Sequence, residues 1–187
     1  MTAAEFSARA IHVLKPTLLW LAVGYIGIKA IASVSPWSLG INNTPSLPVG
    51  LYLKEKITPN EPVSVGDWVC HNYNPPEWAA QRNYAPREKP VCKPIAALPG
   101  YKLEVTDTTI KVFNKLGVLQ AEYPYEKTDS EGRSIPLALV TATVAENQVV
   151  LITPYVSRGL DSRYFGPRWR HEMTTRIYPL ITWVAAQ

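Results

Sequence analysis

Ser46 is the residue of this sequence whose surroundings first suggest catalysis, because it lies between Pro45 and Pro48 within residues 42–52. Each proline fixes its own φ at about −65° and biases the preceding residue towards extended conformations. The two prolines therefore predict a stiff, extended backbone at Ser46, and a serine held in this way is a candidate nucleophile. The alternative is that residues 42–52 are a proline-rich linker between an apolar segment and a domain.

A serine hydroxyl needs a base before it can attack a carbonyl group. The three histidines form no spacing pattern and suit surface or packing roles. Lys93 is the better candidate, because residues 91–98 around it are mostly apolar. Burial disfavours the ammonium form, and lowering the pKa from about 10.4 to about 7 corresponds to roughly 4–5 kcal/mol, which apolar burial can supply. The alternative is a strand lysine that points to solvent.

Composition and charge narrow the classes of function. The chain has 187 residues, of which 47% are apolar and 18% charged, and this suits one globular domain with a membrane segment. The net charge of +4 comes from scattered Lys and Arg residues, so no nucleic-acid partner is expected. Cys70 and Cys92 are too few for a zinc site, and no phosphate-binding loop, HExxH or CxxC motif is present. We therefore expect no metal and no cofactor.

Residues 16–35 predict a transmembrane anchor. They form a run of twenty residues in which Lys29 carries the only charge, and as a helix this run spans about 30 Å, the thickness of the hydrocarbon core of a bilayer. Arg9 and Lys15 predict that residues 1–15 are cytoplasmic and that residues 36–187 lie across the membrane. The rival interpretation is a cleaved signal peptide. Because only ten residues separate Ser35 from Ser46, the candidate nucleophile is expected close to the outer membrane surface.

The remainder of the sequence predicts a mainly β fold, because short segments rich in β-branched and aromatic residues alternate with turn residues. The expected strands are residues 50–56, 63–73, 91–98, 101–106, 109–113, 137–143, 147–153 and 177–186, with loops at 74–90 and 121–136. A turn at residues 107–108 joins two of these strands in a predicted hairpin. We find no internal repeat and no sign of a second domain.

Four of these stretches together resemble the type I signal peptidases, the serine peptidase family S26. Residues 44–52, 92–100 and 160–167 follow the order and rough spacing of that family's conserved boxes, and residues 62–69 resemble the strand before the lysine. Within the family, the Ser-Leu-Pro-Val-Gly-Leu-Tyr box and the Asp-Ser-Glu-Gly-Arg-Ser-Ile-Pro loop are most similar to the TraF-type peptidases of conjugative plasmid transfer. The resemblance covers about residues 10–185 and implies a signal-peptidase-like β-fold catalytic domain with one N-terminal transmembrane helix.

The resemblance also implies a Ser/Lys catalytic dyad. Neutral Lys93 would take the proton from Ser46, which would attack a scissile carbonyl and form an acyl-enzyme. The oxyanion would be held by the backbone N–H of Ser46 and by the hydroxyl of Thr44, at the place where the family usually has a hydroxyl residue. Asp161 and Arg163 resemble the family's structural ion pair behind the site, and in the TraF-like branch the aspartate is also implicated in activity.

One departure from the family pattern concerns the group that orients the lysine. The family often has a serine two residues before the aspartate, and this chain has Gly159. Ser157 or Ser162 could replace that serine, or the lysine is held in another way.

The resemblance places Cys70 and Cys92 on the two strands that flank the site. In an oxidising periplasm it therefore implies a disulfide between them. Two buried free thiols are the alternative.

Together these observations predict a single-pass protein of the bacterial inner membrane with a periplasmic catalytic domain. Its expected function is to process pilin or other precursors of a conjugative transfer or type IV secretion system, with hydrolysis and cyclisation of the product both open. Its expected partners are a membrane-bound pilin or preprotein substrate and inner-membrane lipid. The alternatives are a general signal peptidase and a catalytically decayed, membrane-tethered scaffold of pilus assembly, which Gly159 would favour.

Overall fold

The computed structural model describes residues 3–44, 46–59, 61–84 and 90–184, without the side chains of residues 3–16 and 184. The sequence predictions for Arg9 and Lys15 concern side chains outside this part, and Pro45 lies outside it altogether. The chain divides into two compact units, Met1–Ser38 and Leu39–Gln187. We describe each unit by itself.

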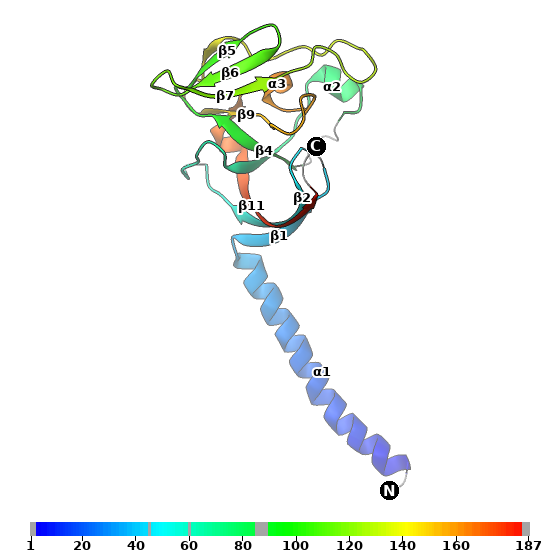
Figure 1. Ribbon diagram of the computed structural model, residues 1–187. Coiled ribbons are helices and arrows are strands. Elements are labelled where there is room, and N and C mark those ends of the chain that lie inside the picture. The colour runs from blue at the N-terminus through cyan, green and yellow to red at the C-terminus, as the bar shows by residue number, and fades with distance from the viewer. Residues whose placement is uncertain (1–2, 45, 60, 85–89, 185–187) are drawn as a thin grey trace. The chain divides into compact units, whose positions relative to one another are not determined.

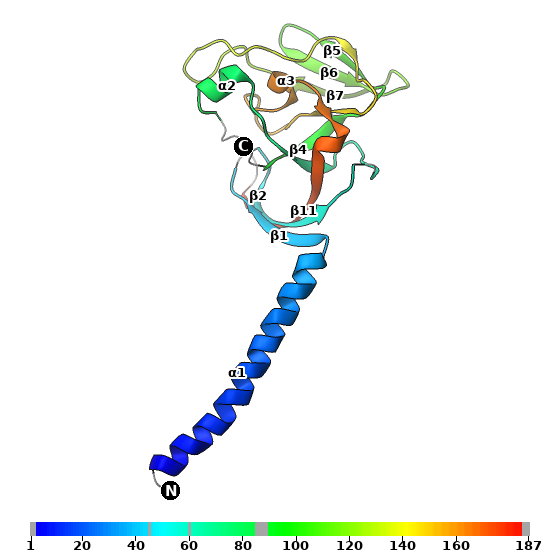
Figure 2. The same cartoon turned by 180° about the vertical axis from the view of Figure 1, so that it is seen from behind.

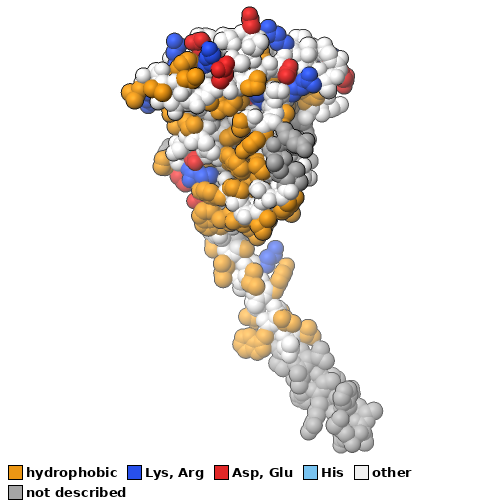
Figure 3. Space-filling view, viewed as in Figure 1, with side chains coloured by type: hydrophobic (Ala, Val, Ile, Leu, Met, Phe, Trp, Pro, Cys, Tyr) orange, Lys and Arg blue, Asp and Glu red, His pale blue; other side chains and the backbone are white. Residues whose placement is uncertain are grey.

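The first unit is dominated by one long helix, α1 (Ala3–Val34; Figure 1). Its segment Thr17–Val34 is long and apolar enough to cross a membrane. The side chains of this segment are exposed, and hydrophobic groups lie along it (Figure 3). Apolar surface left in water is unfavourable. The apolar helix expected over residues 16–35 is therefore confirmed, and its composition fits both a membrane anchor and a signal sequence.

The second unit is built mainly from two β-sheets, which confirms the predicted fold class. The seven-stranded sheet has the order β1 (Trp37–Asn42), β2 (Val49–Lys56), β11 (Met173–Val184), β3 (Trp68–Asn72), β4 (Pro90–Ala97), β9 (Gln148–Leu151) and β10 (Arg168–Trp169). The four-stranded sheet has the order β7 (Leu119–Pro124), β6 (Thr109–Phe113), β5 (Lys102–Val105) and β8 (Ala142–Thr143). Three short helical segments complete the unit: α2 (Glu77–Gln81), α3 (Ser162–Phe165) and the 3₁₀ turn Arg170–Glu172.

The larger sheet curves, and this curvature brings distant strands together. Two strands, β11 and β3, lie between β2 and β4 in the sheet, so a flat sheet would hold β2 and β4 about 14 Å apart. Figure 1 shows β2 and β11 bending away from the upper part of the unit. Gly50 at the start of β2 permits a close approach, because a Cβ atom there would collide with the backbone oxygen of Ile181 in β11. Only a residue without a side chain fits at this crossing.

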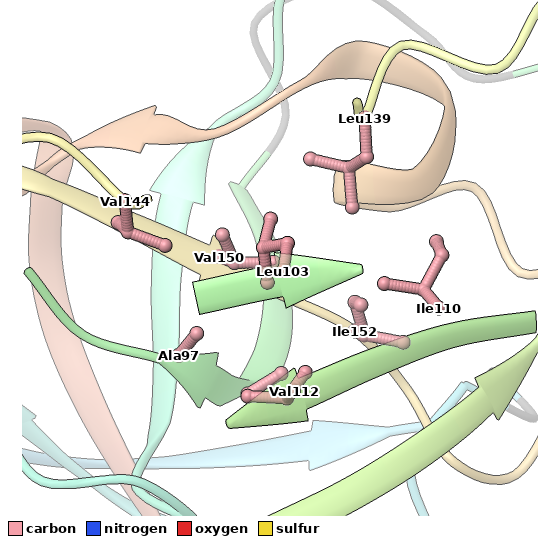
Figure 4. Packing of buried hydrophobic residues seen from close by; sticks show 9 residues of the cluster. Ala97, Leu103, Ile110, Val112, Leu139, Val144, Val150 and Ile152 are labelled. Atoms are coloured by element: carbon pink, nitrogen blue, oxygen red, sulfur yellow. The ribbon is translucent and has the colours of Figure 1, made fainter. Parts of the chain in front are cut away.

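Strand β4 packs into two different core clusters. Ala97 belongs to a core cluster with residues of the smaller sheet, including Leu103, Ile110 and Val112 (Figure 4). Ile95, two residues earlier, packs in a second cluster on the larger sheet. Because these side chains are 0–3% exposed, the register of β4 is strongly fixed. This strand therefore offers a rigid support for a side chain near its N-terminal end.

Most of the predicted strands are confirmed, including the hairpin of β5 and β6 around residues 107–108 and the strands β2, β4 and β9. The strand expected over residues 137–143 is wrong except at Ala142–Thr143. Within the rest of that segment, the N–H of Ala138 donates to the carbonyl oxygen of Arg163, and Leu139 is buried in the core. Residues 137–141 therefore satisfy their packing and part of their hydrogen bonding without a ladder.

Four other predicted boundaries are corrected. The strand expected from residue 63 begins only at Trp68, because residues 64–67 form a turn in which Gly66 has φ +90° and Asp67 accepts the N–H of Ser64. The predicted loop 74–90 contains α2, and its residues 85–89 lie outside the described part. The predicted loop 121–136 begins inside β7, whereas β11 starts at Met173, four residues before the predicted start.

Candidate active site

Ser46 lies in the connection between β1 and β2, and Asn42 at the end of β1 holds this connection in place. Asn42 Nδ2 donates to the backbone oxygens of Thr44 at 2.9 Å, Leu47 at 3.0 Å and Pro48 at 3.1 Å. Because carbonyl oxygens only accept hydrogen bonds, these three contacts fix the orientation of the amide. The local backbone at Ser46 is therefore clamped by one side chain, which the sequence analysis did not identify.

Thr44 and Ser46 are adjacent through their hydroxyl groups. Thr44 Oγ1 lies 3.3 Å from Ser46 Oγ and also donates to Asn42 Oδ1 at 2.8 Å. Since the proton of Thr44 points to Asn42, the hydrogen bond with Ser46 has Ser46 as its donor. Thr44 must therefore rotate its hydroxyl before it can donate to an oxyanion. Among the described residues, no acceptor is recorded for the backbone N–H of Ser46, which leaves this N–H able to bind an oxyanion.

Lys93 lies on β4 and is only 4% exposed, as its apolar neighbours predict. Burial lowers the pKa of Lys93 to about 8, with the charge of Asp161 opposing the shift and that of Arg163 adding to it. The direction of this shift is the one that burial of an ammonium group predicts. A substantial fraction of Lys93 is therefore neutral near pH 8.

Ser46 and Lys93 line the same cleft, which has a volume of about 660 Å³. Aromatic and apolar side chains, including Tyr52, Tyr73 and Leu160, form much of its wall. No direct hydrogen bond is recorded between these two described residues, and catalytic hydrogen bonds are often long without substrate. The described residues contain no group of three or more His, Cys, Asp or Glu side chains placed to hold a metal ion.

Thr153 connects the backbone of the candidate nucleophile to Asp161. Its hydroxyl donates to the backbone oxygen of Ser46 at 2.6 Å, and its own N–H donates to Asp161 Oδ2 at 3.0 Å. Thr153 is completely buried. Sequence reasoning missed this residue, because a threonine at the end of the apolar run 147–153 gives no signal of such a role.

Asp161 and Arg163 form a buried ion pair with two hydrogen bonds. Arg163 Nη2 lies 2.7 Å from Asp161 Oδ2, and Arg163 Nε lies 2.9 Å from Oδ1. Burial raises the pKa of Asp161, and the hydrogen bonds from Arg163 oppose that rise. The guanidinium also donates to the backbone oxygens of Pro124 and Val156, both at 2.7 Å. With its charge and donors satisfied, the pair fixes the segment behind Lys93.

The position of Gly159 has no room for the serine that the family often has there. A Cβ atom at Gly159 would lie 2.5 Å from Thr153 Cγ2, 3.0 Å from the oxygen of Val156 and 3.1 Å from Arg163 Nη2. The methyl group of Thr153 therefore occupies the space that a side chain at residue 159 would need.

The two serines considered as replacements are engaged elsewhere. Ser162 Oγ accepts the N–H of Leu151 at 2.9 Å, and Ser157 Oγ donates to Glu126 Oε1 at 3.3 Å. Neither serine is recorded in contact with Lys93. The structure therefore does not bring Ser157 or Ser162 to the candidate base.

A disulfide joins Cys70 and Cys92. The two cysteines face each other in the antiparallel register of β3 and β4, and the same register places Val69 opposite Lys93. Both cysteines also line the cleft. The cross-link thus lies one residue before Lys93 and fastens the strand that carries it.

Comparisons with known proteins find a matching family and several relatives of this chain. The sequence matches the family described as "Signal peptidase, peptidase S26" over residues 11–179. It is 31% identical over 155 residues to "Plasmid transfer protein TraF" of Escherichia coli, covering 76% of this chain and 82% of that protein. It is 29% identical over 177 residues to "Conjugal transfer protein TraF" of Agrobacterium tumefaciens (strain 15955), covering 80% of this chain and 86% of that protein. Among solved structures, a signal peptidase I from Enterococcus faecalis V583 matches with a TM-score of 0.37 and 19% identity, covering 65% of this chain and 98% of that chain.

Proposed function

The chain belongs to the signal peptidase family S26, and we propose that it is a serine peptidase in which Ser46 is the nucleophile and Lys93 the general base. The observation that carries this proposal is the shared cleft: Ser46 and a buried lysine with a pKa of about 8 line the same hollow. A lysine with this pKa can be neutral at working pH, and a neutral amine can accept a hydroxyl proton.

The reaction proceeds through an acyl-enzyme. Neutral Lys93 takes the proton of Ser46 Oγ as the oxygen attacks the scissile carbonyl carbon. The backbone N–H of Ser46 and the rotated hydroxyl of Thr44 donate to the developing oxyanion. When the carbon–nitrogen bond breaks, the proton on Lys93 passes to the leaving amine, and the acyl group remains as an ester on Ser46. A water molecule or an amine then attacks this ester, and Lys93 accepts the proton of the attacking group.

Thr153, Asp161 and Arg163 serve the reaction by positioning. Thr153 holds the carbonyl group of Ser46 and so helps to fix the backbone that carries the nucleophile. Asp161 fixes the backbone of Thr153 and exerts its charge on Lys93. The bidentate hydrogen bonds from Arg163 keep the carboxylate of Asp161 in one orientation. The three residues thus link the nucleophile and the base to the same rigid support.

The substrate that we propose is a membrane-tethered protein precursor, such as a pilin, of a conjugative transfer system. The relatives described as plasmid or conjugal transfer proteins support this setting. The apolar helix α1 would anchor the enzyme in the inner membrane, with residues 36–187 in the periplasm. The eleven residues between Val34 and Ser46 reach at most about 40 Å, so a substrate held in the same membrane can present its cleavage site to Ser46.

Coexpression of the precursor with the wild type, Ser46→Ala and Lys93→Ala tests the proposal. Only the wild type is expected to process the precursor, and the mass of the product distinguishes the two fates of the acyl-enzyme. A cyclic product is one water lighter than the linear cleaved peptide, because closing the ring forms one more peptide bond. Processing that survives Ser46→Ala would exclude the proposed nucleophile.

The alternative of a decayed scaffold loses the feature that favoured it. Gly159 suggested a missing catalytic group, but the methyl group of Thr153 fills the space beside it. The glycine is therefore explained by packing in this chain.

A further inference from the structure

A second cavity adjoins the catalytic cleft. It has a volume of about 220 Å³, and two of the residues that line it, Tyr84 and Leu160, also line the cleft that contains Ser46 and Lys93. The two hollows are therefore neighbours that share one wall. A peptide lying in the cleft passes this wall, so a side chain of the peptide can reach the second cavity.

The walls of the second cavity are largely apolar and aromatic. Trp78 comes from α2 and Tyr164 from α3, and these two helices lie next to each other in both views (Figures 1 and 2). The rings of Trp78 and Tyr84 pack edge to face with their centroids 6.0 Å apart. Ile135, which is 8% exposed, closes another side. An apolar hollow of this kind favours an apolar occupant, because both surfaces leave water when they meet.

Asp129 fixes the wall between the two cavities. Tyr84 Oη donates to Asp129 Oδ2, and the same oxygen accepts from Arg133 Nε at 2.7 Å and from Arg82 Nη1 at 3.3 Å. Asp129 Oδ1 accepts the backbone N–H groups of Glu131 and Arg133, both at 2.9 Å. Burial opposes ionisation, but the hydrogen bonds from Tyr84 and Arg133 hold the pKa of Asp129 well below its usual range. The carboxylate therefore stays charged and its charge stays matched.

This network joins two segments that are far apart in the sequence. Residues 77–84 precede β4, and the loop around Asp129 follows β7. The arginine side chains that bond to the carboxylate also cover the aromatic wall, since the guanidinium of Arg82 lies 5.4 Å from the ring centre of Trp78. The cavity is thus a preformed hollow with a fixed rim, and binding there requires little ordering of the protein.

We propose that this second cavity is a subsite that receives a large apolar or aromatic side chain of the peptide substrate while the scissile bond lies at Ser46. The inference rests on the proposed peptidase function. The apolar lining favours an apolar side chain, and the wall shared with the cleft places the cavity within reach of a peptide bound there. Of the two charged residues in the lining, Asp129 is already matched by Arg82 and Arg133, and Arg158 is itself an exposed cation, so a positively charged side chain would find no free carboxylate to offset its lost hydration.

Filling the cavity tests the subsite. Ser130 lines the second cavity but not the cleft, and it is exposed, so Ser130→Trp adds bulk to the hollow without entering the core. The matched control is Val140→Trp, because Val140 is 66% exposed and lines neither cavity. The substrates are versions of the coexpressed precursor with Phe or Ala placed in turn at each position around the cleavage site.

In the wild type and in Val140→Trp, one position of the precursor is expected to favour Phe over Ala at least fivefold in processing rate. In Ser130→Trp this preference is expected to disappear. An unchanged preference in Ser130→Trp would contradict the subsite, and so would an equal loss of both precursors, since a structural defect would have that effect.

A binding measurement separates this inference from the catalytic proposal. Indole added to full-length Ser46→Ala protein in detergent is expected to show saturation-transfer NMR contact with the protein, and Ser130→Trp is expected to abolish it while Val140→Trp keeps it. Indole contact that is absent, or unchanged by Ser130→Trp, would overturn the subsite. Processing that survives Ser46→Ala would instead overturn the proposed nucleophile, and the indole result would still decide the cavity.

Discussion

The hydroxyl of Thr153 donates a hydrogen bond to the backbone oxygen of Ser46, with the two oxygens 2.6 Å apart. The residues are 107 positions apart in the chain. The contact joins the connection between β1 and β2, which carries Ser46, to the segment that follows β9. It also orients the peptide unit that follows the candidate nucleophile. A buried threonine thus takes part in the geometry of the site although its hydroxyl does not touch the reacting atoms.

Removing this hydroxyl is expected to impair catalysis with a modest cost in stability. Thr153→Val keeps the shape of the side chain but leaves the carbonyl oxygen of Ser46 without its donor, which typically costs about 1–3 kcal/mol in the free energy of unfolding. We expect processing to slow about tenfold or more, because the backbone that carries the Ser46 side chain loses one of the hydrogen bonds that fix it. Urea unfolding and processing rates check both effects. Thr153→Ser retains the hydroxyl and serves as the control, and a Thr153→Val enzyme as fast as the wild type would contradict the assigned role.

A side chain at Gly159 is expected to destabilise the protein. The Cβ atom of Gly159→Ser would lie 2.5 Å from Thr153 Cγ2 and 3.1 Å from Arg163 Nη2, and overpacking of this kind typically costs about 1–3 kcal/mol. Combining Gly159→Ser with Thr153→Ser removes the methyl group from the clash and is expected to recover part of the loss. Thermal unfolding of the single and double variants measures this coupling. The packing explanation fails if Gly159→Ser is as stable as the wild type.

The rate of processing is expected to rise with pH through about 8. Burial lowers the pKa of Lys93, so the neutral form that acts as the base is scarce below about pH 8 and predominates above it. Single-turnover rates measured from pH 6 to pH 10 should follow the deprotonation of one group with a midpoint near this value. A rate that is independent of pH, or that falls across this interval, would show that neutral Lys93 is not required.

Loss of the disulfide is expected to lower stability. The cross-link joins Cys70 and Cys92 across a sequence separation of 22, and closing a loop of this size typically contributes about 3 kcal/mol to the free energy of unfolding. The double variant Cys70→Ser/Cys92→Ser should lose about this amount and should process precursor more slowly, because the bond lies next to Lys93. Urea unfolding of oxidised, reduced and variant protein provides the measurement. Equal stability of all three forms would contradict a structural role for the bond.

The sequence was sufficient to predict those features that depend on residues close together in the chain. The apolar run over residues 16–35 predicted the helix α1, and short segments rich in β-branched, aromatic and apolar residues predicted β2, β4 and the hairpin of β5 and β6. The apolar neighbours of Lys93 left burial and exposure to solvent both open, and the structure shows that the side chain is buried. The boxes of the signal peptidase family gave the residues to examine, and the match to the family over residues 11–179 confirms that resemblance.

The features that were missed depend on contacts between distant segments. Asn42 is an ordinary polar residue in the sequence, and only the folded loop brings its amide to three carbonyl groups. Leu139 lies in a predicted strand, but hydrogen bonding of its neighbour to Arg163 replaces the ladder. In the sequence, Gly159 marks the absence of a serine, whereas in the structure the methyl group of Thr153, on another segment, leaves no room for a side chain there. Propensity and periodicity carry no information on such pairings.

Trapping the acyl-enzyme tests the central claim most directly. The wild type, Ser46→Ala and Lys93→Ala are mixed with precursor, quenched in acid at short times, digested and mapped by mass spectrometry. The account predicts that the wild type carries the N-terminal part of the precursor as an ester on the peptide that contains Ser46, and that neither variant accumulates it. An ester on another residue, or precursor cleavage by Ser46→Ala at the wild-type rate, would contradict the account.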